Sequence, residues 1–162
     1  MSDNIFNKTL GILESQKLNV VDKDTERPWG GFYVISENNA QDFSNIYFNG
    51  LNTEELKVSG KLSPKILIIA PNKRLSWQYH HRRSEIWKVS SGEIKVVTSN
   101  DDVERKETLL RSGDEIKLYK GERHRIVGTN DYAVVAEIWI HTDTDNPSDE
   151  DDIVRVQDDY GR

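Results

Sequence analysis

From residue 29 onward, short runs of β-branched and aromatic residues alternate with short polar runs that contain glycine, asparagine, aspartate, serine or proline. Such an alternation is typical of strands joined by turns. It predicts strands at residues 31–36, 45–48, 65–70, 84–90, 94–98, 106–110, 115–118, 124–127 and 132–141. No helical period interrupts residues 65–141, so the pattern predicts an all-β antiparallel barrel or sandwich and argues against a parallel α/β sheet.

The two ends of the chain do not follow the strand pattern. Between residues 4 and 17 the apolar residues recur near the helical period, which predicts a short helix packed on the outside of the domain. These residues are Ile5, Phe6, Leu10 and Leu13. Residues 142–149 are acidic and polar, and we expect a connector without regular structure there.

With 162 residues and no cysteine, the chain is long enough for one hydrophobic core and too short for two ordinary domains. The absence of cysteine excludes disulfides, thiolate metal ligands and cysteine nucleophiles. No charged-then-apolar leader opens the sequence and no apolar run approaches the length of a membrane span, so we expect a cytoplasmic protein. The net charge of −6 disfavours nucleic acid and anionic membranes as partners.

The candidate chemistry lies around Gln78, His80, Glu85 and His124. If residues 76–81 are extended, Gln78 and His80 leave the same face of the strand. Glu85 follows a short bend, and His124 follows a turn that begins another strand. Two nitrogen and two oxygen donors that converge from two strands make a divalent-metal site, and a side-chain amide opens it compared with a closed structural zinc site. The alternative for His80 is a strand histidine hydrogen-bonded in the core.

The same residues carry a family resemblance. The spacing Gln78-x-His80-x4-Glu85-x6-Gly92, followed by Gly113-x5-Tyr119-x-Gly121-x2-His124, resembles the two cupin motifs, with Gln78 where many cupins have the first histidine. The surrounding sequence segments are similar to those of the type II mannose-6-phosphate isomerase domain. They are Arg27-Pro28-Trp29-Gly30, Leu75-Ser76-Trp77-Gln78-Tyr79-His80-His81, Arg83-Ser84-Glu85-Ile86-Trp87, Glu150-Asp151-Asp152-Ile153-Val154-Arg155 and Asp158-Asp159-Tyr160-Gly161-Arg162.

This resemblance implies both a fold and an activity. The fold is a cupin double-stranded β-helix, a jelly-roll barrel, over residues 27–141; residues 1–26 form an N-terminal helix and extension, and residues 142–162 fold back on the barrel. The activity is the interconversion of mannose 6-phosphate and fructose 6-phosphate, a proton transfer between adjacent carbons through an enediol. The cofactor is a divalent metal ion, with zinc expected first and manganese, iron, cobalt or nickel as alternatives.

The resemblance also assigns roles to residues. The metal ligands are Gln78, His80, Glu85 and His124. The phosphate of the substrate is expected at basic side chains, whose planar or compact cations suit its oxygens. These are Arg155 and Arg162, with Arg27, Lys65 and Arg83 as further candidates. The residue that carries the proton is not assigned, and the candidates are Glu85, Asp159 and a metal-bound water. Arg155 is also expected to be a catalytic residue.

Two departures from the type II pattern keep other functions open. Arg82 and Ile86 stand where these isomerases usually have histidines, so the choice of sugar could have shifted. The alternatives are a cupin dioxygenase, a non-catalytic phosphosugar-binding cupin, and an isomerase or epimerase of a related sugar. The bifunctional members carry a nucleotidyltransferase domain ahead of the cupin, and 162 residues leave no room for one, so we expect no GDP-mannose synthesis.

Besides the small phosphosugar, the exposed sheet edges suggest a protein partner. Small cupins expose long edges, and dimerisation is a common way to cover them. We therefore expect a homodimer, with the amino-terminal helix or the first strands at the contact. The tryptophans at positions 29, 77, 87 and 139 are expected in the core or an interface more than as a sugar-stacking platform.

Overall fold

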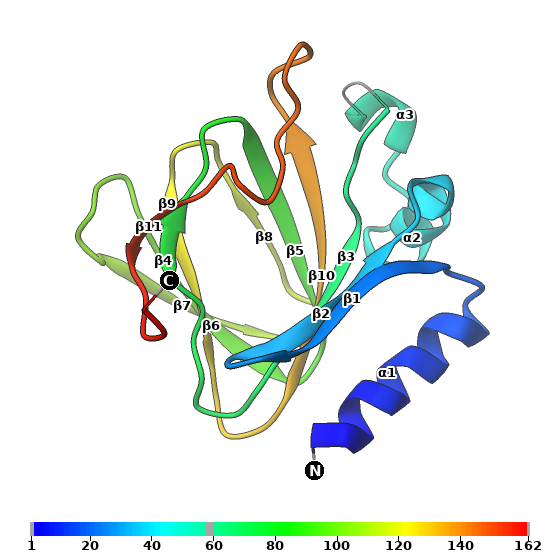
Figure 1. Cartoon of the computed structure of the whole chain (residues 1–162), viewed down its shortest axis with the longest axis horizontal. Helices are drawn as coiled ribbons and strands as arrows, with labels where there is room; N and C mark the ends of the chain where they lie inside the picture. Colours follow the sequence, from blue (N-terminus) through cyan, green and yellow to red (C-terminus); the bar gives the residue numbers. More distant parts are fainter. Residues whose placement is uncertain (1, 58–59, 162) are drawn as a thin grey trace.

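A computed structural model describes residues 2–57 and 60–161 of the chain. Its centre is a barrel made of two antiparallel sheets that face each other (Figure 1). The first sheet has the order β1 (Val20–Arg27), β2 (Gly30–Ile35), β3 (Lys65–Ile69), β10 (Ala133–His141), β5 (Arg83–Ser91), β8 (Glu115–Leu118). The second has the order β11 (Val154–Gln157), β4 (Trp77–Tyr79), β9 (Arg123–Gly128), β6 (Glu93–Ser99), β7 (Lys106–Arg111).

The two central strands β3 and β10 are buried on both faces, which explains their almost uninterrupted apolar sequences. One face contributes Leu67, Ile69 and Val135 to the core inside the barrel. The other contributes Ile66, Ile68 and Ile138 to a second core outside it. The helices cover this second core, and the barrel interior is left to the strands (Figure 1).

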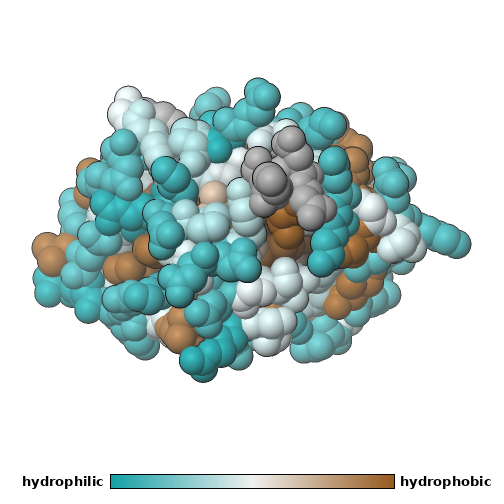
Figure 2. Space-filling view, turned by 90° about the horizontal axis from the view of Figure 1, so that it is seen from below, coloured by the Kyte–Doolittle hydropathy of each residue, from teal (hydrophilic) through white to brown (hydrophobic). Residues whose placement is uncertain are grey.

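The helix α1 (Ser2–Ser15) lies on the outside of the barrel, as the sequence predicts (Figure 1). Its Phe6 and Leu13 are buried in the outer core, and the main-chain oxygen of Phe6 accepts a hydrogen bond from the Tyr33 hydroxyl at 3.1 Å. No helix in the described part of the chain is long and apolar enough to cross a membrane. Seen from below, the molecule is mainly hydrophilic, and its hydrophobic residues form separate small patches (Figure 2).

The prediction of a strand at residues 45–48 is wrong, because this segment belongs to helix α2 (Ala40–Tyr47). The apolar residues Ala40, Phe43 and Tyr47 fall on one helical face and are buried in the outer core. Two further short helices flank it, η1 (Glu37–Asn39) and α3 (Thr53–Leu56). The β-branched and aromatic residues of this segment favour a strand locally, but burial of one helical face in the outer core selects the helix.

The other eight predicted strands are present, and the structure adds three more in the residues that it describes, β1, β4 and β11. Strand β1 is polar and half-exposed, so it carries no apolar alternation that could predict it. The turn into β2 needs Gly30, whose φ is +139° and whose added Cβ would lie 1.9 Å from the Ile68 oxygen. Strand β11 pairs with β4 and brings the end of the chain back along the barrel. The expected class, an all-β antiparallel barrel with a short N-terminal helix, is confirmed.

Candidate functional site

Three donors from separate strands meet inside the barrel. His80 follows β4, Glu85 lies on β5 and His124 lies on β9. The Nε2 atoms of the two histidines are 3.3 Å apart. The Glu85 carboxylate places one oxygen 3.3 Å from Nε2 of His80 and the other 3.6 Å from Nε2 of His124. All three side chains are buried, and their ligand atoms lie within 4.8 Å of one another.

The partners of the two imidazoles define which nitrogen of each ring carries the proton. Nδ1–H of His80 donates to the main-chain oxygen of Asp152 at 2.7 Å, and Nδ1–H of His124 donates to that of Glu122 at 3.1 Å. Burial lowers the pKa of His80 to about 3 and also lowers the pKa of His124, so both rings are neutral at pH 7. Both Nε2 lone pairs therefore point into the same small space, which suits a cation between them.

Glu85 supplies a negative charge to this space. Burial raises the pKa of Glu85, but the neighbouring Arg83 guanidinium outweighs it and the pKa falls to about 2. Nε of Arg83 donates to the Glu85 carboxylate at 2.8 Å. A second guanidinium nitrogen lies 3.3 Å from Nε2 of His80, which is placed to accept its hydrogen bond. Glu85 is thus an ionised, fully buried ligand candidate at pH 7.

Gln78 and the histidines form a donor set that fits a divalent ion. In the sheet register Gln78 stands directly opposite His124, and its side chain faces the same cavity as His80. Two imidazole nitrogens, a carboxylate and an amide oxygen are ligands that zinc, manganese, iron, cobalt and nickel all accept. The structure thus brings the ligand atoms of His80, Glu85 and His124 within 4.8 Å of one another, and Gln78 lies on the wall of the adjoining cavity.

A cavity of about 110 Å³ opens beside these donors. Four of the five predicted substrate-binding residues line it: Arg27, Lys65, Arg83 and Arg155. The fifth, Arg162, lies outside the described residues. Asp159 does not line the cavity, because its carboxylate accepts two hydrogen bonds from Arg74, at 2.6 and 2.8 Å.

The basic side chains of the cavity differ in the hydrogen bonds and ion pairs that they make within the protein. The Arg83 guanidinium also donates to Ser148 Oγ and to the main-chain oxygen of Asp149, both at 3.0 Å, and stacks 3.5 Å from the ring centroid of Trp139. Nζ of Lys65 pairs at 2.6 Å with Glu150, whose side chain is 71% exposed. The Arg155 side chain makes no hydrogen bond or ion pair with the residues that the structure describes. Arg83 and the buried Lys65 are thus held by partners within the protein, while the Arg155 side chain is exposed and can meet an anion directly.

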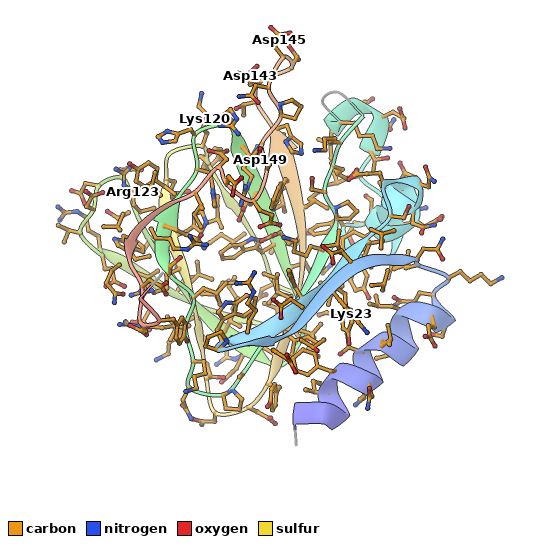
Figure 3. All side chains as sticks on the ribbon, viewed as in Figure 1. Lys23, Lys120, Arg123, Asp143, Asp145 and Asp149 are labelled. Atoms are coloured by element: carbon orange, nitrogen blue, oxygen red, sulfur yellow. The ribbon has the colours of Figure 1, made fainter. Side chains whose placement is uncertain are left out.

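The segment before β11 closes one side of the site. Asp143 and Asp145 lie at the tip of the loop that follows β10, and Asp149 lies nearer to the barrel (Figure 3). Asp152 is buried, and its carboxylate accepts the main-chain N–H groups of His81 and Arg82 at 2.9 and 3.0 Å. Because the main-chain oxygen of Asp152 also accepts from His80, this aspartate sets the position of the turn that carries the ligand.

Sequence reasoning did not select Glu137, which also lines the cavity. The residue is 6% exposed and lies in the middle of β10. Its carboxylate oxygens accept the indole N–H groups of Trp87 at 2.9 Å and Trp139 at 2.8 Å. The signal was a single carboxylate in an otherwise apolar run, since a charge is costly to bury without a function or a partner.

A sequence model of the family described as Mannose-6-phosphate isomerase C-terminal matches residues 38–158. The chain belongs to this family. Its cupin-type barrel and the type II resemblance are thereby confirmed. All four tryptophans are buried, as expected, and those at positions 29, 87 and 139 also line the cavity.

Two curated relatives extend the comparison to whole proteins. The alginate biosynthesis protein AlgA of Pseudomonas aeruginosa is 31% identical over 122 residues, which are 75% of this chain and 24% of AlgA. The xanthan biosynthesis protein XanB of Xanthomonas campestris pv. campestris is 32% identical over 109 residues, 67% of this chain and 22% of XanB. The chain thus spans about a quarter of the length of these relatives.

A solved structure supports the fold. The capsular polysaccharide assembling protein CapF of Staphylococcus aureus aligns over 86% of this chain and 34% of its own, with a TM-score of 0.56 and 14% sequence identity. At this identity the match concerns the barrel and not its chemistry. The chain is a mannose-6-phosphate isomerase-like C-terminal domain whose buried His/Glu triad could bind a metal ion.

Proposed function

We propose that this domain is a metal-dependent sugar-phosphate isomerase that interconverts mannose 6-phosphate and fructose 6-phosphate or a close relative of this pair. The observation that carries the proposal is a cavity whose walls include His80 and Glu85 of the buried donor cluster together with basic side chains. Aldose–ketose isomerisation needs both: polarisation of a carbonyl at one end of the sugar and recognition of a phosphate at the other. The family match supports the same substrate class.

Gln78, His80, Glu85 and His124 would hold the metal ion, which when bound polarises the sugar carbonyl. The residues of the chain do the remaining work. Lys65 lies with Nζ 4.9 Å from the ring centroid of Phe32 and 4.8 Å from that of Trp139, so its ammonium is fixed against aromatic faces. We assign the phosphate to Lys65 and Arg155, with Arg27 at the same wall. The buried indoles exclude water from the reacting carbons.

One observation favours a second candidate function, a phosphosugar-binding domain without turnover. The Arg83 guanidinium lies against both Glu85 and Nε2 of His80, so a resident cation already meets two of the proposed ligands. A protein that satisfies its buried donors in this way is complete without an ion. In that case the cavity would still bind the phosphate of the sugar, but no metal ion would polarise the sugar carbonyl.

The experiment that tests the proposal is a coupled assay of fructose 6-phosphate formation from mannose 6-phosphate, run with metal-analysed protein. We expect turnover that is lost after chelation and restored by a divalent ion, and a much weaker response from H124A. H81N serves as the matched control, because His81 is exposed and does not line the cavity. Binding of mannose 6-phosphate in calorimetry without any turnover by metal-replete protein would select the binding domain instead.

A further inference from the structure

Glu137 is a buried carboxylate that lines the same cavity as His80 and Glu85 of the metal donors. It lies on the central strand β10, opposite Trp87 of β5 and opposite Lys65 of β3. Its side chain has 6% of its surface exposed and lines the cavity wall. Burying a carboxylate at the centre of an apolar sheet is unfavourable, so the position calls for a compensating function.

Only neutral donors hold this carboxylate in place. The indole N–H of Trp139 donates to one oxygen at 2.8 Å, and that of Trp87 donates to the other at 2.9 Å. No ion pair to Glu137 is found among the described residues. An ionised carboxylate offers about four lone-pair positions. The two indoles therefore fix the orientation of the group and leave it capacity to accept a proton.

The position of Glu137 relative to the metal donors is also defined. The same indole N–H of Trp87 that reaches Glu137 lies 3.1 Å from the second oxygen of Glu85. One donor thus lies between a predicted metal ligand and Glu137, and both carboxylates line the cavity. A sugar carbon beside the metal donors would also lie beside Glu137.

The charges around Glu137 keep it able to exchange a proton near neutral pH. Burial raises the pKa of Glu137 to about 7, and the negative charge of Glu85 adds to this effect. The positive charges of Lys65 and Arg83 act in the opposite direction. Two carboxylates in one site whose environments push their pKa values apart are a common acid–base arrangement. A general base works best when its pKa lies close to the working pH.

We propose that Glu137 is the catalytic residue that carries the proton between the two reacting carbons of the substrate. The inference rests on the proposed isomerase function and deepens it. The Glu137 carboxylate takes the proton from C2 of the open-chain aldose. The C2–H bonding pair becomes the C1–C2 double bond, and the carbonyl pair moves to O1, which gains a proton.

The second half of the step returns the proton. The electron pair of the C1–C2 double bond forms the new C1–H bond with the proton of the Glu137 carboxylic acid. The O2–H bonding pair becomes the C2 carbonyl bond, and the O2 proton passes to solvent water, which also supplies the proton that O1 gained. One proton thus leaves oxygen for each proton that oxygen gains, and nothing is oxidised or reduced overall.

Three carboxylates line the cavity. Glu85 is engaged by the histidines and Arg83, and Glu150 pairs with Lys65, so among the described residues Glu137 is the cavity carboxylate without an ion pair. Asp159 lies outside the cavity and is engaged by Arg74.

The test compares E137Q with the wild-type protein, both purified with their metal, with mannose 6-phosphate as substrate in D2O. Glutamine keeps the size of the side chain and cannot take a proton. We expect kcat to fall by at least about a hundredfold, together with the incorporation of solvent deuterium into the product. Metal content and the Kd for mannose 6-phosphate should stay within about threefold, since binding and proton transfer use different groups. E107Q, an exposed carboxylate of β7 outside the cavity, should match the wild type in every measurement.

E137D supplies the second variant, because glutamine could weaken the two indole hydrogen bonds and with them the fold. Aspartate keeps the acid and moves it by one methylene. We expect kcat between those of the wild type and E137Q, with a larger isotope effect for substrate deuterated at C2. If E137Q fails to fold or loses its metal, an unchanged kcat and isotope effect in E137D would overturn the inference.

The outcomes separate this inference from the function on which it rests. A wild-type protein that isomerises, together with an E137Q variant whose kcat stays within about fivefold, would overturn the role of Glu137 and leave the isomerase intact. A metal-replete wild-type protein that isomerises neither mannose 6-phosphate nor a related sugar phosphate would overturn both. Loss of turnover and of deuterium exchange in E137Q alone, with binding retained, is the expected result.

Discussion

His80 and His124 owe their orientation to the main chain. Each ring donates Nδ1–H to a backbone oxygen, that of Asp152 for His80 and that of Glu122 for His124. A side-chain partner could rotate away, whereas these oxygens are fixed by the turns that contain them. Both Nε2 atoms are therefore held 3.3 Å apart before any ligand binds. Such preorganisation raises metal affinity, because the free energy of arranging the ligands is not taken from binding.

The first prediction concerns the metal. Replacing His80 by alanine removes one imidazole ligand. Loss of a hydrogen bond that merely orients a ligand lowers metal affinity about 10- to 100-fold, so we expect the affinity of H80A for a divalent ion to fall by at least this factor. Elemental analysis and titration of the metal-free protein measure this effect. H81A is the control, since the His81 ring is exposed and packs at 5.4 Å on Tyr79 outside the cavity. Equal metal content in H80A and the wild type would contradict the proposed site.

The sequence predicts which residues share a face, because side chains alternate along a strand. It does not predict roles that depend on neighbours from other parts of the fold. Gln78 and His80 share a face because side chains alternate along a strand, and this follows from sequence alone. Glu137 has the same strand context as its apolar neighbours, so its place in the cavity depends on which face of β10 turns inward. Arg83 was selected as a substrate group, yet its donors to Glu85, Ser148 and Asp149 could not be foreseen without the fold.

At the scale of elements, residues 142–153 and β11 complete the cavity that the strands begin. Ile153 and Arg155 line its wall, and β11 extends the five-stranded sheet beside β4. The connector was expected to lack regular structure, and it contains no helix or strand. Its contacts to the barrel are nevertheless specific, because Ser148, Asp149 and Asp152 all bond to groups around His80 and Arg83. The site is therefore built from both the barrel and this segment.

The second prediction concerns the contact between this segment and β3. Glu150 pairs with Lys65 at 2.6 Å from an exposed position, so its carboxylate competes with any anion that Lys65 binds. Only the Glu150 end of this pair is exposed, and an ion pair screened by solvent in this way contributes on the order of 1 kcal/mol. Replacing Glu150 by glutamine should therefore tighten binding of inorganic phosphate or mannose 6-phosphate by up to about fivefold.

Calorimetry on E150Q, K65Q and the exposed control E107Q measures this effect. K65Q should bind the anion more weakly than the wild type, and E107Q should bind it equally. An unchanged or weaker affinity in E150Q would mean that Lys65 is not the phosphate group. In that case Arg155, which also lines the cavity, would be the next side chain to replace.

The third prediction concerns pH and the link between β10 and the connector. Nδ1 of His141 accepts the main-chain N–H of Ser148 at 2.9 Å, which requires a ring without a proton on that nitrogen. Burial, together with the positive charges of Lys61 and Arg83, lowers the pKa of His141 to about 4. The unfolded chain, with a histidine pKa of about 6.5, binds the proton first on acidification. The contribution of neutral His141 to the free energy of unfolding is therefore complete above pH 6.5 and is lost as the pH falls toward 4.

The free energy of unfolding of the wild type should thus decrease over this window, with His141 contributing up to about 3 kcal/mol. H141N keeps an acceptor near the Nδ1 position and does not titrate, so its decrease should be smaller. Because His80 and His124 also have lowered pKa values, the difference between the two proteins isolates His141. Denaturant unfolding at pH 7, 6, 5 and 4 measures it. Parallel curves for both proteins would contradict the assignment.

At the scale of the whole molecule, the six-stranded sheet lies between two cores. Its inner face packs into the barrel and its outer face packs on α1 and α2, so β3 and β10 are apolar on both sides. Such strands are easily predicted from sequence, because they are nearly continuous apolar runs. The edge strand β1 is different. It gains its place only by pairing with β2, and nothing in its polar sequence indicates that partner.

This exposed edge supports the last prediction, that the protein is a homodimer. Strand β1 ends the six-stranded sheet, and Val21 on it is 62% exposed. Beside it, a groove between α1 and β1 is lined by apolar residues, among them Leu10, Leu18 and Val21, and by an equal number of polar residues. An unpaired edge next to exposed apolar groups is a surface that proteins commonly cover with a second copy. Light scattering should therefore give about twice the chain mass of 18.7 kDa.

Replacing Val21 by lysine would place a charge at the proposed contact. We expect V21K to shift the measured mass toward that of the monomer, because burying an unpaired ammonium at an interface is costly and a lysine on an edge strand opposes pairing. V103K makes the same substitution at a residue of a β6–β7 turn that is 57% exposed, and it should leave the mass unchanged. A monomeric wild type would exclude the dimer, and a V21K dimer as stable as the wild type would place the contact away from β1.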